Sequence, residues 1–114
     1  MPIPQAQSAF IEPAKLRDYL LNPAHPVGGP KARWFISLGY HPDNPDQLAA
    51  DLLAIAKNDA DYLEELNPYG VKYVVTGEVA TPSGRLTRIV TVWIVDAGQS
   101  SPRLVTAYPA EDPL

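Results

Sequence analysis

The spacing of apolar residues predicts three short helices in the first half of the chain. A proline stands near the start of each, at Pro13, Pro30 and Pro45, where its missing N–H costs no helical hydrogen bond. Apolar side chains then recur at intervals of three and four residues, which gives each helix one face for burial. They are Leu16, Tyr19 and Leu20 in the first helix, Trp34, Phe35 and Leu38 in the second, and Leu48, Leu52, Ile55 and Ala56 in the third.

After Pro68 the pattern changes to β-branched and aromatic residues, which are typical of strands. We predict three strands, YGVKYVVTGEV, RLTRIVTVWIV and RLVTAYP, joined by the connections TPSG and DAGQSSP. The second strand is apolar on both faces in its latter half, which favours a central position. Helices followed by strands predict an α+β fold, with short N-terminal helices packed on a C-terminal antiparallel β-meander.

The length of 114 residues indicates a single domain, 1–114. We expect an extended arm over 1–9, a helical part over 12–60, an antiparallel sheet over 69–109 and a tail over 110–114. The third helix is expected to end between Lys57 and Ala60.

Composition narrows the chemistry. The chain has no cysteine, which excludes disulfides, thiolate metal sites and a cysteine nucleophile, and its two histidines give little support for a metal site. We therefore expect neither metal nor cofactor. No apolar run approaches the ~20 residues of a membrane helix, and the N-terminus has no basic or apolar signal segment. A free-standing, soluble, cytoplasmic protein without membrane association is expected. The sequence does not set its oligomeric state.

The net charge of −4 argues against binding nucleic acid through overall charge, but it leaves a local basic cleft open. The stretch NPAHPVGGPKARWF is the first candidate for such a cleft. His25 is held between two prolines, and Lys31 falls in the first turn of the second helix, where free amides suit an anion. The alternative is structural, with His25 capping a turn and Lys31 reaching out to water.

The last strand supplies the second candidate. Thr106 and Tyr108 are two residues apart, so both are expected on one face of the sheet together with Leu104. The alternative is an ordinary edge strand. Arg33 points away from the Lys31 face by about 200° on a helical wheel, and Arg85 follows the turn at Gly84.

The segments KLRDYLLNPAHPVGGPKARWF, YGVKYVVTGEVATPSGR, VTVWIV and PRLVTAYP resemble a bacterial family described only as a domain of unknown function. They also look like the C-terminal domains of polymorphic and contact-dependent inhibition toxins. The resemblance runs from about residue 8 to 109. It implies the barnase–EndoU–colicin–RelE-like ribonuclease fold, and a metal-independent endoribonuclease that cleaves RNA through a 2′,3′-cyclic phosphate.

The same resemblance implies the roles of individual residues. His25 would transfer protons, Lys31 would stabilise charge on the phosphoryl oxygens, Thr106 would donate a hydrogen bond to the phosphate, and Tyr108 would orient the scissile group, stack on a base or carry the second proton. Arg33 and Arg85 would bind substrate. The alternative is a catalytically inactive interaction module of a toxin–antitoxin or similar system. RNA and an antitoxin or immunity-type protein are the expected partners.

Overall fold

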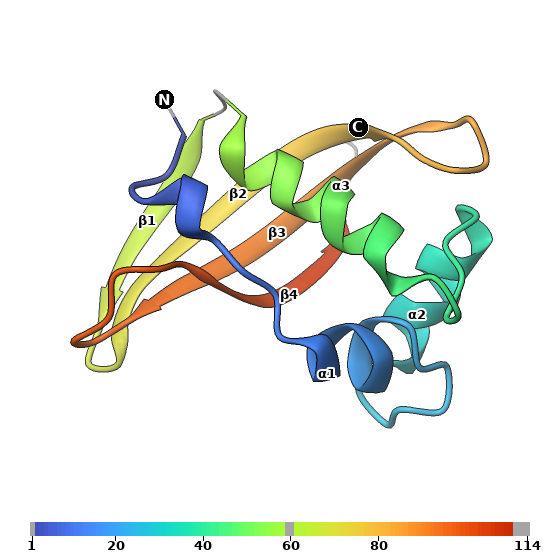
Figure 1. Ribbon diagram of the computed structural model, residues 1–114, viewed down its shortest axis with the longest axis horizontal. Helices are drawn as coiled ribbons and strands as arrows, with labels where there is room; N and C mark the ends of the chain where they lie inside the picture. Colours follow the sequence, from blue (N-terminus) through green and yellow to red (C-terminus); the bar gives the residue numbers. More distant parts are fainter. Residues whose placement is uncertain (1, 59–60, 111–114) are drawn as a thin grey trace.

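The computed structural model describes residues 2–58 and 61–110. The helices lie where the three prolines and apolar stripes predict them (Figure 1). After a short 3-10 turn, η1 (Ala6–Ser8), they are α1 (Pro13–Lys15) with its continuation as a π-type turn, η2 (Leu16–Leu20), then α2 (Gly29–Ser37) and α3 (Pro45–Lys57). Gly39 ends the second helix with a φ of 98°, as its C-cap position requires.

The second half of the chain forms one antiparallel sheet whose strands follow the chain order β1-β2-β3-β4. The strands are β1 (Tyr62–Asn67), β2 (Gly70–Ala80), β3 (Leu86–Asp96) and β4 (Arg103–Pro109). The α+β fold class is confirmed, and β3 holds the interior position predicted for the most apolar strand.

Strand β1 corrects the predicted sheet boundary, because the sheet begins at Tyr62 and not at residue 69. The segment YLEELN shows no strand pattern, since five of its six residues are exposed. An edge strand tolerates charge on both faces. Its carboxylates pair across to β2: Tyr73 donates its hydroxyl proton to Glu64 (3.2 Å), and Lys72 lies 3.4 Å from Glu65.

The N-terminal segment also differs from the predicted extended arm over 1–9. It turns at η1 and buries Ile3, Ala6 and Ala9 in the hydrophobic core. Ile3 is the one large aliphatic residue among residues 2–9, so the segment shows no repeated apolar stripe. Within the predicted boundaries, residue 1 of the arm, residues 59–60 of the helical part and 111–114 of the tail lie outside the described residues.

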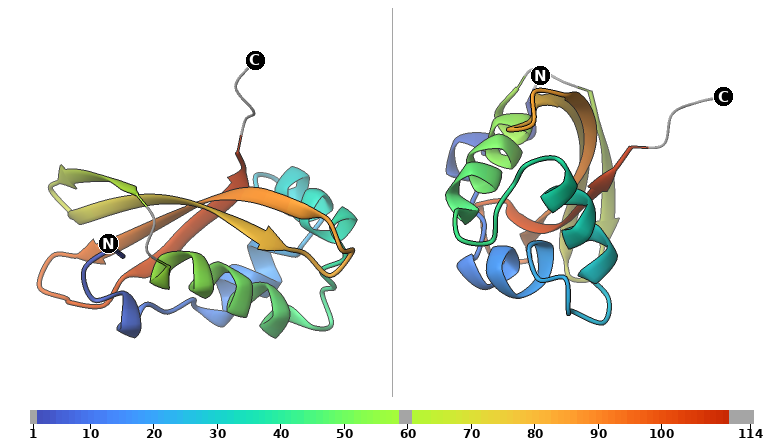
Figure 2. Two further views of the ribbon diagram at one scale, coloured as in Figure 1. Left: turned by 90° about the horizontal axis from the view of Figure 1, so that it is seen from above. Right: turned by 90° about the vertical axis from the view of Figure 1, so that its right-hand side faces the viewer.

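The helices and the N-terminal segment lie along one face of the sheet, and α2 lies at one end of it (Figure 2). The stripe predicted for α3 is buried, with Leu48, Leu52, Ile55 and Ala56 at most 1% exposed. Close packing of α3 on β2 depends on Gly77, because a Cβ there would come within 2.9 Å of Ile55. In the described part of the chain, no helix combines the length and apolarity needed to cross a membrane.

A register shift in β4 alters the predicted face of the last strand. Trp93 pairs with Leu104 and Val92 pairs with Thr106, so Val105 is an extra residue on β4. The bulge separates Leu104, which is fully buried in the core, from Thr106. The expectation that Leu104 shares one face with Thr106 and Tyr108 is therefore wrong, since strict alternation breaks at Val105.

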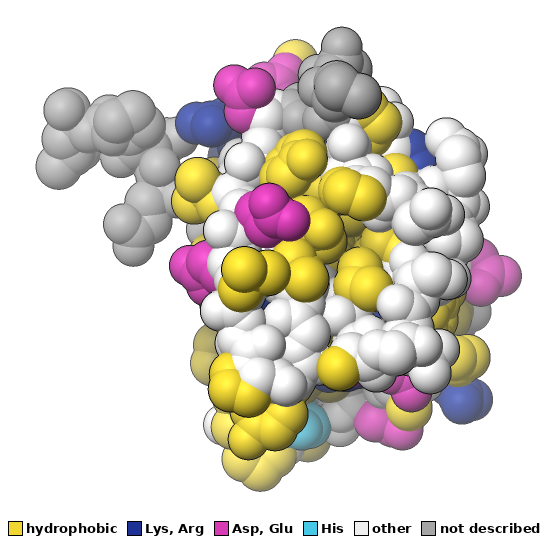
Figure 3. All heavy atoms as spheres, turned by 90° about the vertical axis from the view of Figure 1, so that its left-hand side faces the viewer, with side chains coloured by type: hydrophobic (Ala, Val, Ile, Leu, Met, Phe, Trp, Pro, Cys, Tyr) yellow, Lys and Arg dark blue, Asp and Glu magenta, His cyan; other side chains and the backbone are white. Residues whose placement is uncertain are grey.

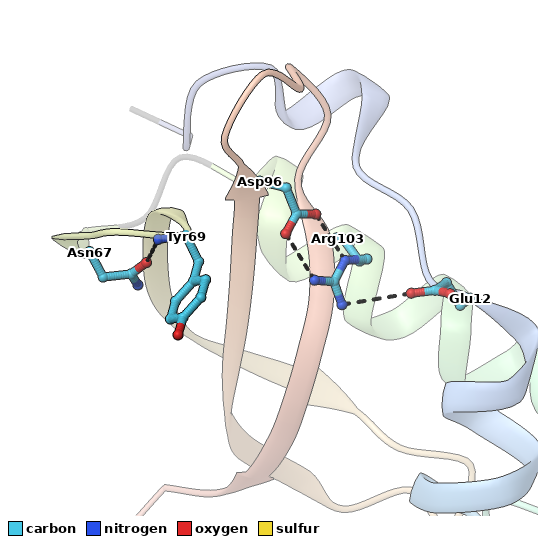
Figure 4. A network of polar contacts seen from close by, with 5 residues as sticks. All are labelled: Glu12, Asn67, Tyr69, Asp96 and Arg103. Atoms are coloured by element: carbon cyan, nitrogen blue, oxygen red, sulfur yellow. Dashed lines mark hydrogen bonds and ion pairs between the residues drawn. The ribbon is translucent and has the colours of Figure 1, made fainter.

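The N-terminal segment is fastened to β4 by Arg103. Its guanidinium donates two hydrogen bonds of 3.1 Å to the Asp96 carboxylate at the end of β3, and it lies 3.7 Å from Glu12 (Figure 4). Phe10 and Arg103 also pair as an isolated parallel bridge. This network holds Glu12 at the start of α1, one residue before the helices that carry the site described below.

Candidate functional site

Three polar groups from distant parts of the chain converge where η2 and α2 meet β4. The Lys31 ammonium donates to the Tyr19 hydroxyl (2.8 Å) and to the Thr106 hydroxyl (3.2 Å). The hydroxyls of Tyr19 and Thr106 are 3.1 Å apart. All three side chains are half-buried. We call Tyr19, Lys31 and Thr106 the polar triad.

The triad alters the acidity of Tyr19. Burial acts to raise the pKa of the phenol, whereas hydrogen bonds with Lys31 and Thr106 act to lower it. The charges of Lys31 and Lys15 act in the same direction, and both ammonium groups lie near the face of the ring, 5.3 and 4.9 Å from its centroid. The net result is a pKa below the usual value of about 10. Tyr19 is thus a phenol placed to give up its proton more readily.

His25 lies beside the triad with its ring edge-on to Tyr19, at a centroid distance of 5.2 Å. Its Nδ1 accepts hydrogen bonds from the backbone N–H groups of Val27 (3.0 Å) and Gly28 (2.8 Å). A neutral ring whose Nδ1 is an acceptor carries its proton on Nε2. His25 therefore caps the turn before α2 through one nitrogen and keeps an N–H donor on the other.

The glycine pair of the turn explains how Tyr19 comes so close to α2. A Cβ on Gly28 would lie 2.5 Å from the Tyr19 ring and 2.7 Å from its carbonyl oxygen, and a Cβ on Gly29 would lie 2.6 Å from the carbonyl of Pro23. Only residues without side chains allow this approach. The motif VGGP therefore positions both the helix and the aromatic ring that packs against it.

Of the predicted site residues, Lys31 and Thr106 are in contact, His25 lies next to them across Tyr19, and Tyr108 is outside the triad. Among the described residues, the hydrogen bonds of Lys31 and Thr106 go to Tyr19 and not to Tyr108. Tyr108 is 36% exposed on β4. It lines a pocket of about 470 Å³ on the other side of Lys31, together with Trp34 and Pro30.

The two predicted substrate-binding arginines lie apart from each other. Arg33 is exposed on α2 and donates to the carbonyl of Pro23 (3.3 Å), so it supports the turn at Gly29. Arg85 lines a pocket of about 390 Å³ that shares Trp34, Pro109 and Ala110 with the pocket of Tyr108. Arg85 is thus connected to the triad through two adjoining pockets, whereas Arg33 lines neither.

Tyr19 is the functional candidate that the sequence analysis assigned only to an apolar helix face. Its neighbours Leu16 and Leu20 are buried as that stripe predicts. The available signal was chemical, because a buried phenol needs a hydrogen-bond partner, and the chain offers glycines for a close approach. A third pocket, of about 350 Å³, opens on the far side of Tyr19 and is lined also by His25, Lys15 and Glu12.

In the described part of the chain, no group of three or more His, Cys, Asp or Glu residues is arranged to bind a metal ion. The atoms that converge at the triad are an ammonium and two hydroxyls, which are donors toward an anion. Such an arrangement is suited to an oxyanion such as a phosphate.

Comparison with known proteins gives a family and a fold. The chain belongs to the family described as a domain of unknown function (DUF6883), which matches residues 2–111. No curated protein matches the chain.

A solved structure of a contact-dependent growth inhibition toxin–immunity protein complex from Klebsiella pneumoniae 342 contains a chain of similar fold. The TM-score is 0.74 at 20% sequence identity, and the match covers 95% of this chain and 98% of the other. At this identity the likeness establishes a shared fold.

Proposed function

We propose that the protein is a toxin-like, metal-independent endoribonuclease that cleaves RNA through a 2′,3′-cyclic phosphate. The observation that carries the proposal is the convergence of the Lys31 ammonium with the hydroxyls of Tyr19 and Thr106 within 3.2 Å, which lowers the pKa of Tyr19. The fold shared with a chain of a toxin–immunity complex supports a role in a toxin–immunity system, and we assign the toxin role on the chemistry of the triad.

In this proposal Tyr19 and Lys31 act as a proton-transfer pair. The Tyr19 phenolate takes the proton of the RNA 2′-hydroxyl, whose oxygen then attacks the adjacent phosphorus. Lys31 and Thr106 donate hydrogen bonds to the phosphoryl oxygens as negative charge develops. The P–O5′ bond breaks, and the leaving 5′-oxygen takes a proton from the Lys31 ammonium. The resulting phenol and amine are hydrogen-bonded at 2.8 Å, so the proton can pass back from Tyr19 to Lys31.

His25 and Tyr108 take more peripheral roles than the sequence resemblance implies. Nδ1 of His25 accepts hydrogen bonds from two backbone N–H groups. In this proposal the other ring nitrogen, Nε2, donates a hydrogen bond to the phosphate. Tyr108 lines the pocket next to Lys31, and the proposal gives it no part in the proton transfer. Proton transfer by His25 stays a prediction, which the variants below test.

The decisive experiment compares wild-type protein with Tyr19→Phe on RNA in the presence of a chelator. Wild type should cleave and leave 2′,3′-cyclic phosphate ends, whereas Tyr19→Phe should lose about 10²–10⁴-fold in rate, the range of general acid–base catalysis. Tyr69→Phe is the matched control, because Tyr69 is 77% exposed in the β1–β2 turn and lines none of the three pockets. Absence of cleavage by folded wild type would contradict the proposal.

Two substitutions separate the capping and chemical roles of His25. His25→Asn keeps an acceptor near the position of Nδ1 and removes Nε2, whereas His25→Ala removes both. If only the cap matters, His25→Asn retains activity and His25→Ala loses stability. If Nε2 contacts the phosphate or moves a proton, His25→Asn loses activity at unchanged stability.

A second function, that of an immunity-type binding protein without catalysis, is favoured by the charge of the chain. The net charge is −4, and β1 exposes the carboxylates Glu64 and Glu65. Figure 3 looks onto the left-hand side of Figure 1 and shows apolar side chains gathered near the centre of this face, with acidic side chains among and around them. A basic toxin would complement such a surface. This function predicts no RNA cleavage and a stable 1:1 complex with a toxin encoded beside the gene, measured by co-purification.

A further inference from the structure

The two pockets beyond Lys31 form one continuous surface that the proposed cleavage chemistry does not use. The pocket next to Lys31 has a volume of about 470 Å³, and its walls are mainly apolar, with Trp34, Tyr108 and Pro30. Trp34, Pro109 and Ala110 line both this pocket and the adjoining one of about 390 Å³. Volumes of roughly 300–1,000 Å³ are typical of small-molecule sites.

The two pockets differ in the side chains that line them. Lys31 and Tyr108 line the first, Arg85 and Arg88 line the second, and Trp34 lines both. One carboxylate, Glu78, lies in the second pocket opposite Arg88 in the β2–β3 pairing. Three cations therefore face one anion, although the chain as a whole is acidic.

Cations that alternate with exposed aromatic side chains are the features that bind single-stranded nucleic acid, in which bases stack on rings and phosphates meet positive charge. Trp34 is half-buried and Tyr108 is 36% exposed, so both rings are accessible. The other tryptophan, Trp93, is fully buried in the core. The apolar pocket is thus the part of this surface that suits a base, and the arginine pocket the part that suits a phosphate.

We infer that the pocket formed by Pro30, Trp34 and Tyr108 holds an unpaired nucleobase next to the scissile phosphate at Lys31, and that Arg85 and Arg88 hold the next phosphate of the same strand. This inference rests on the proposed function and names its substrate as single-stranded RNA of at least two or three nucleotides. Double-stranded RNA is excluded because its stacked bases cannot enter the pocket.

The test uses a trinucleotide of 2′-O-methyl residues, which lacks the attacking hydroxyl and cannot be cleaved. Binding should quench the fluorescence of Trp34, while that of buried Trp93 is unaffected. Tyr108→Ala should weaken binding roughly 5- to 150-fold, the range of one base–aromatic stacking contact. Trp34→Leu, which keeps an apolar contact with the core, should abolish the quenching. A mononucleotide should bind more weakly than the trinucleotide because it cannot reach both Lys31 and the arginines.

The arginines are tested by the salt dependence of the same binding. Arg85→Gln with Arg88→Gln should reduce the slope of log K against log salt by about 1.4, since each phosphate contact on a single strand contributes roughly 0.7. Arg17→Gln with Lys57→Gln is the matched control, because it removes two exposed positive charges that line none of the three pockets. A slope reduced equally by this control pair would overturn the assignment of the arginine pocket.

The outcomes distinguish this inference from the proposed function. Trinucleotide binding that depends on Tyr108 and the arginines, with no cleavage of RNA, supports the base pocket and contradicts the ribonuclease. Cleavage of RNA that Tyr108→Ala and the arginine pair leave unchanged supports the ribonuclease and overturns the base pocket. No binding and no cleavage overturns both.

Discussion

Two threonines on neighbouring strands stand in very different hydrogen-bonded clusters. Thr91 on β3 is fully buried, donates to the carbonyl of Val75 (2.8 Å) and accepts from the indole N–H of Trp93 (2.8 Å). Thr106 on β4 is half-buried and shares its hydroxyl with Tyr19 and Lys31. The first cluster is neutral and closed to solvent, whereas the second is charged and adjoins two pockets.

Satisfied hydrogen bonds therefore do not by themselves identify a functional site. Both clusters are satisfied, and no described buried side-chain polar atom lacks a partner. The difference lies in access and charge. Lys31 has three ammonium protons and uses two of them within the triad, so one remains for a ligand in the neighbouring pocket. The hydroxyl of Thr91 has no route to solvent, so its cluster can only stabilise the fold.

The largest effect is expected from Lys31→Met, which keeps the apolar stem and removes the charge. Activity on RNA should fall by about 10²–10³-fold, as when one transition-state donor is removed. The rise of activity with pH should also move to higher pH, because the Tyr19 pKa loses the cation that lowers it. Steady-state rates across pH measure both. Unchanged activity would mean that the triad, like the cluster around Thr91, only stabilises the fold.

Thr91→Val should give the opposite result. The substitution leaves the Trp93 indole N–H without its acceptor and the Val75 carbonyl without this donor. A buried group left unpaired costs roughly 1–3 kcal/mol, so the urea midpoint should drop at unchanged m-value. Activity per folded molecule should match wild type. A loss of activity without loss of stability would break the distinction between the two threonines.

Gly28→Ala tests whether activity depends on the position of the Tyr19 ring, because it moves Tyr19 without changing its chemistry. The backbone of Gly28 is helical (φ −81°), so alanine is tolerated conformationally, and its cost comes from the contact with Tyr19. We expect a loss of about 2–3 kcal/mol, the upper part of the range for overpacking, since the ring can swing outward but the Tyr19 carbonyl at 2.7 Å belongs to the backbone. Activity should fall more than stability explains, measured by rates and urea unfolding on the same samples. Equal activity would indicate that the position of the ring is not critical.

The smallest effect is expected at Asp96 in the Arg103 network, because Asp96 lines none of the three pockets. Hydrogen bonds from Arg103, and its charge, lower the pKa of the Asp96 carboxyl. A lowered pKa adds stability above the unfolded value of about 3.9, and this stability is lost as pH falls through the folded value. Wild type should therefore exceed Asp96→Asn slightly in urea midpoint at pH 7, and the difference should vanish near pH 2. Activity should not change.

Much of the fold was predictable because it depends on local patterns. The prolines fix where the helices begin, the stripe of Leu48, Leu52, Ile55 and Ala56 fixes the buried face of α3, and the apolar run in β3 indicates an interior strand. The strand YLEELN could not be predicted in this way, because its place in the sheet depends on pairing with β2 and not on its own composition.

The candidate site was predictable only in part. Lys31 and His25 stand out in the sequence because a cation and a titratable ring adjoin a stiffened turn, and the structure brings Lys31 to Thr106. Tyr108 was chosen because it stands two residues after Thr106 on the same strand. The hydroxyl that meets Thr106 belongs to Tyr19, 87 positions away in the chain, and no local pattern reveals a contact of that range.

The helix starts, the buried faces and the order of helices before strands can be predicted from the amino-acid sequence, because they follow from properties of residues close together in the chain. Which tyrosine contacts Lys31 and Thr106 is known only from the tertiary structure. Lys31 and Thr106 are 75 positions apart in the sequence, and Tyr19 and Thr106 are 87 positions apart. Contacts of that kind depend on how η2, α2 and the bulged β4 pack together, and this packing is a property of the whole chain.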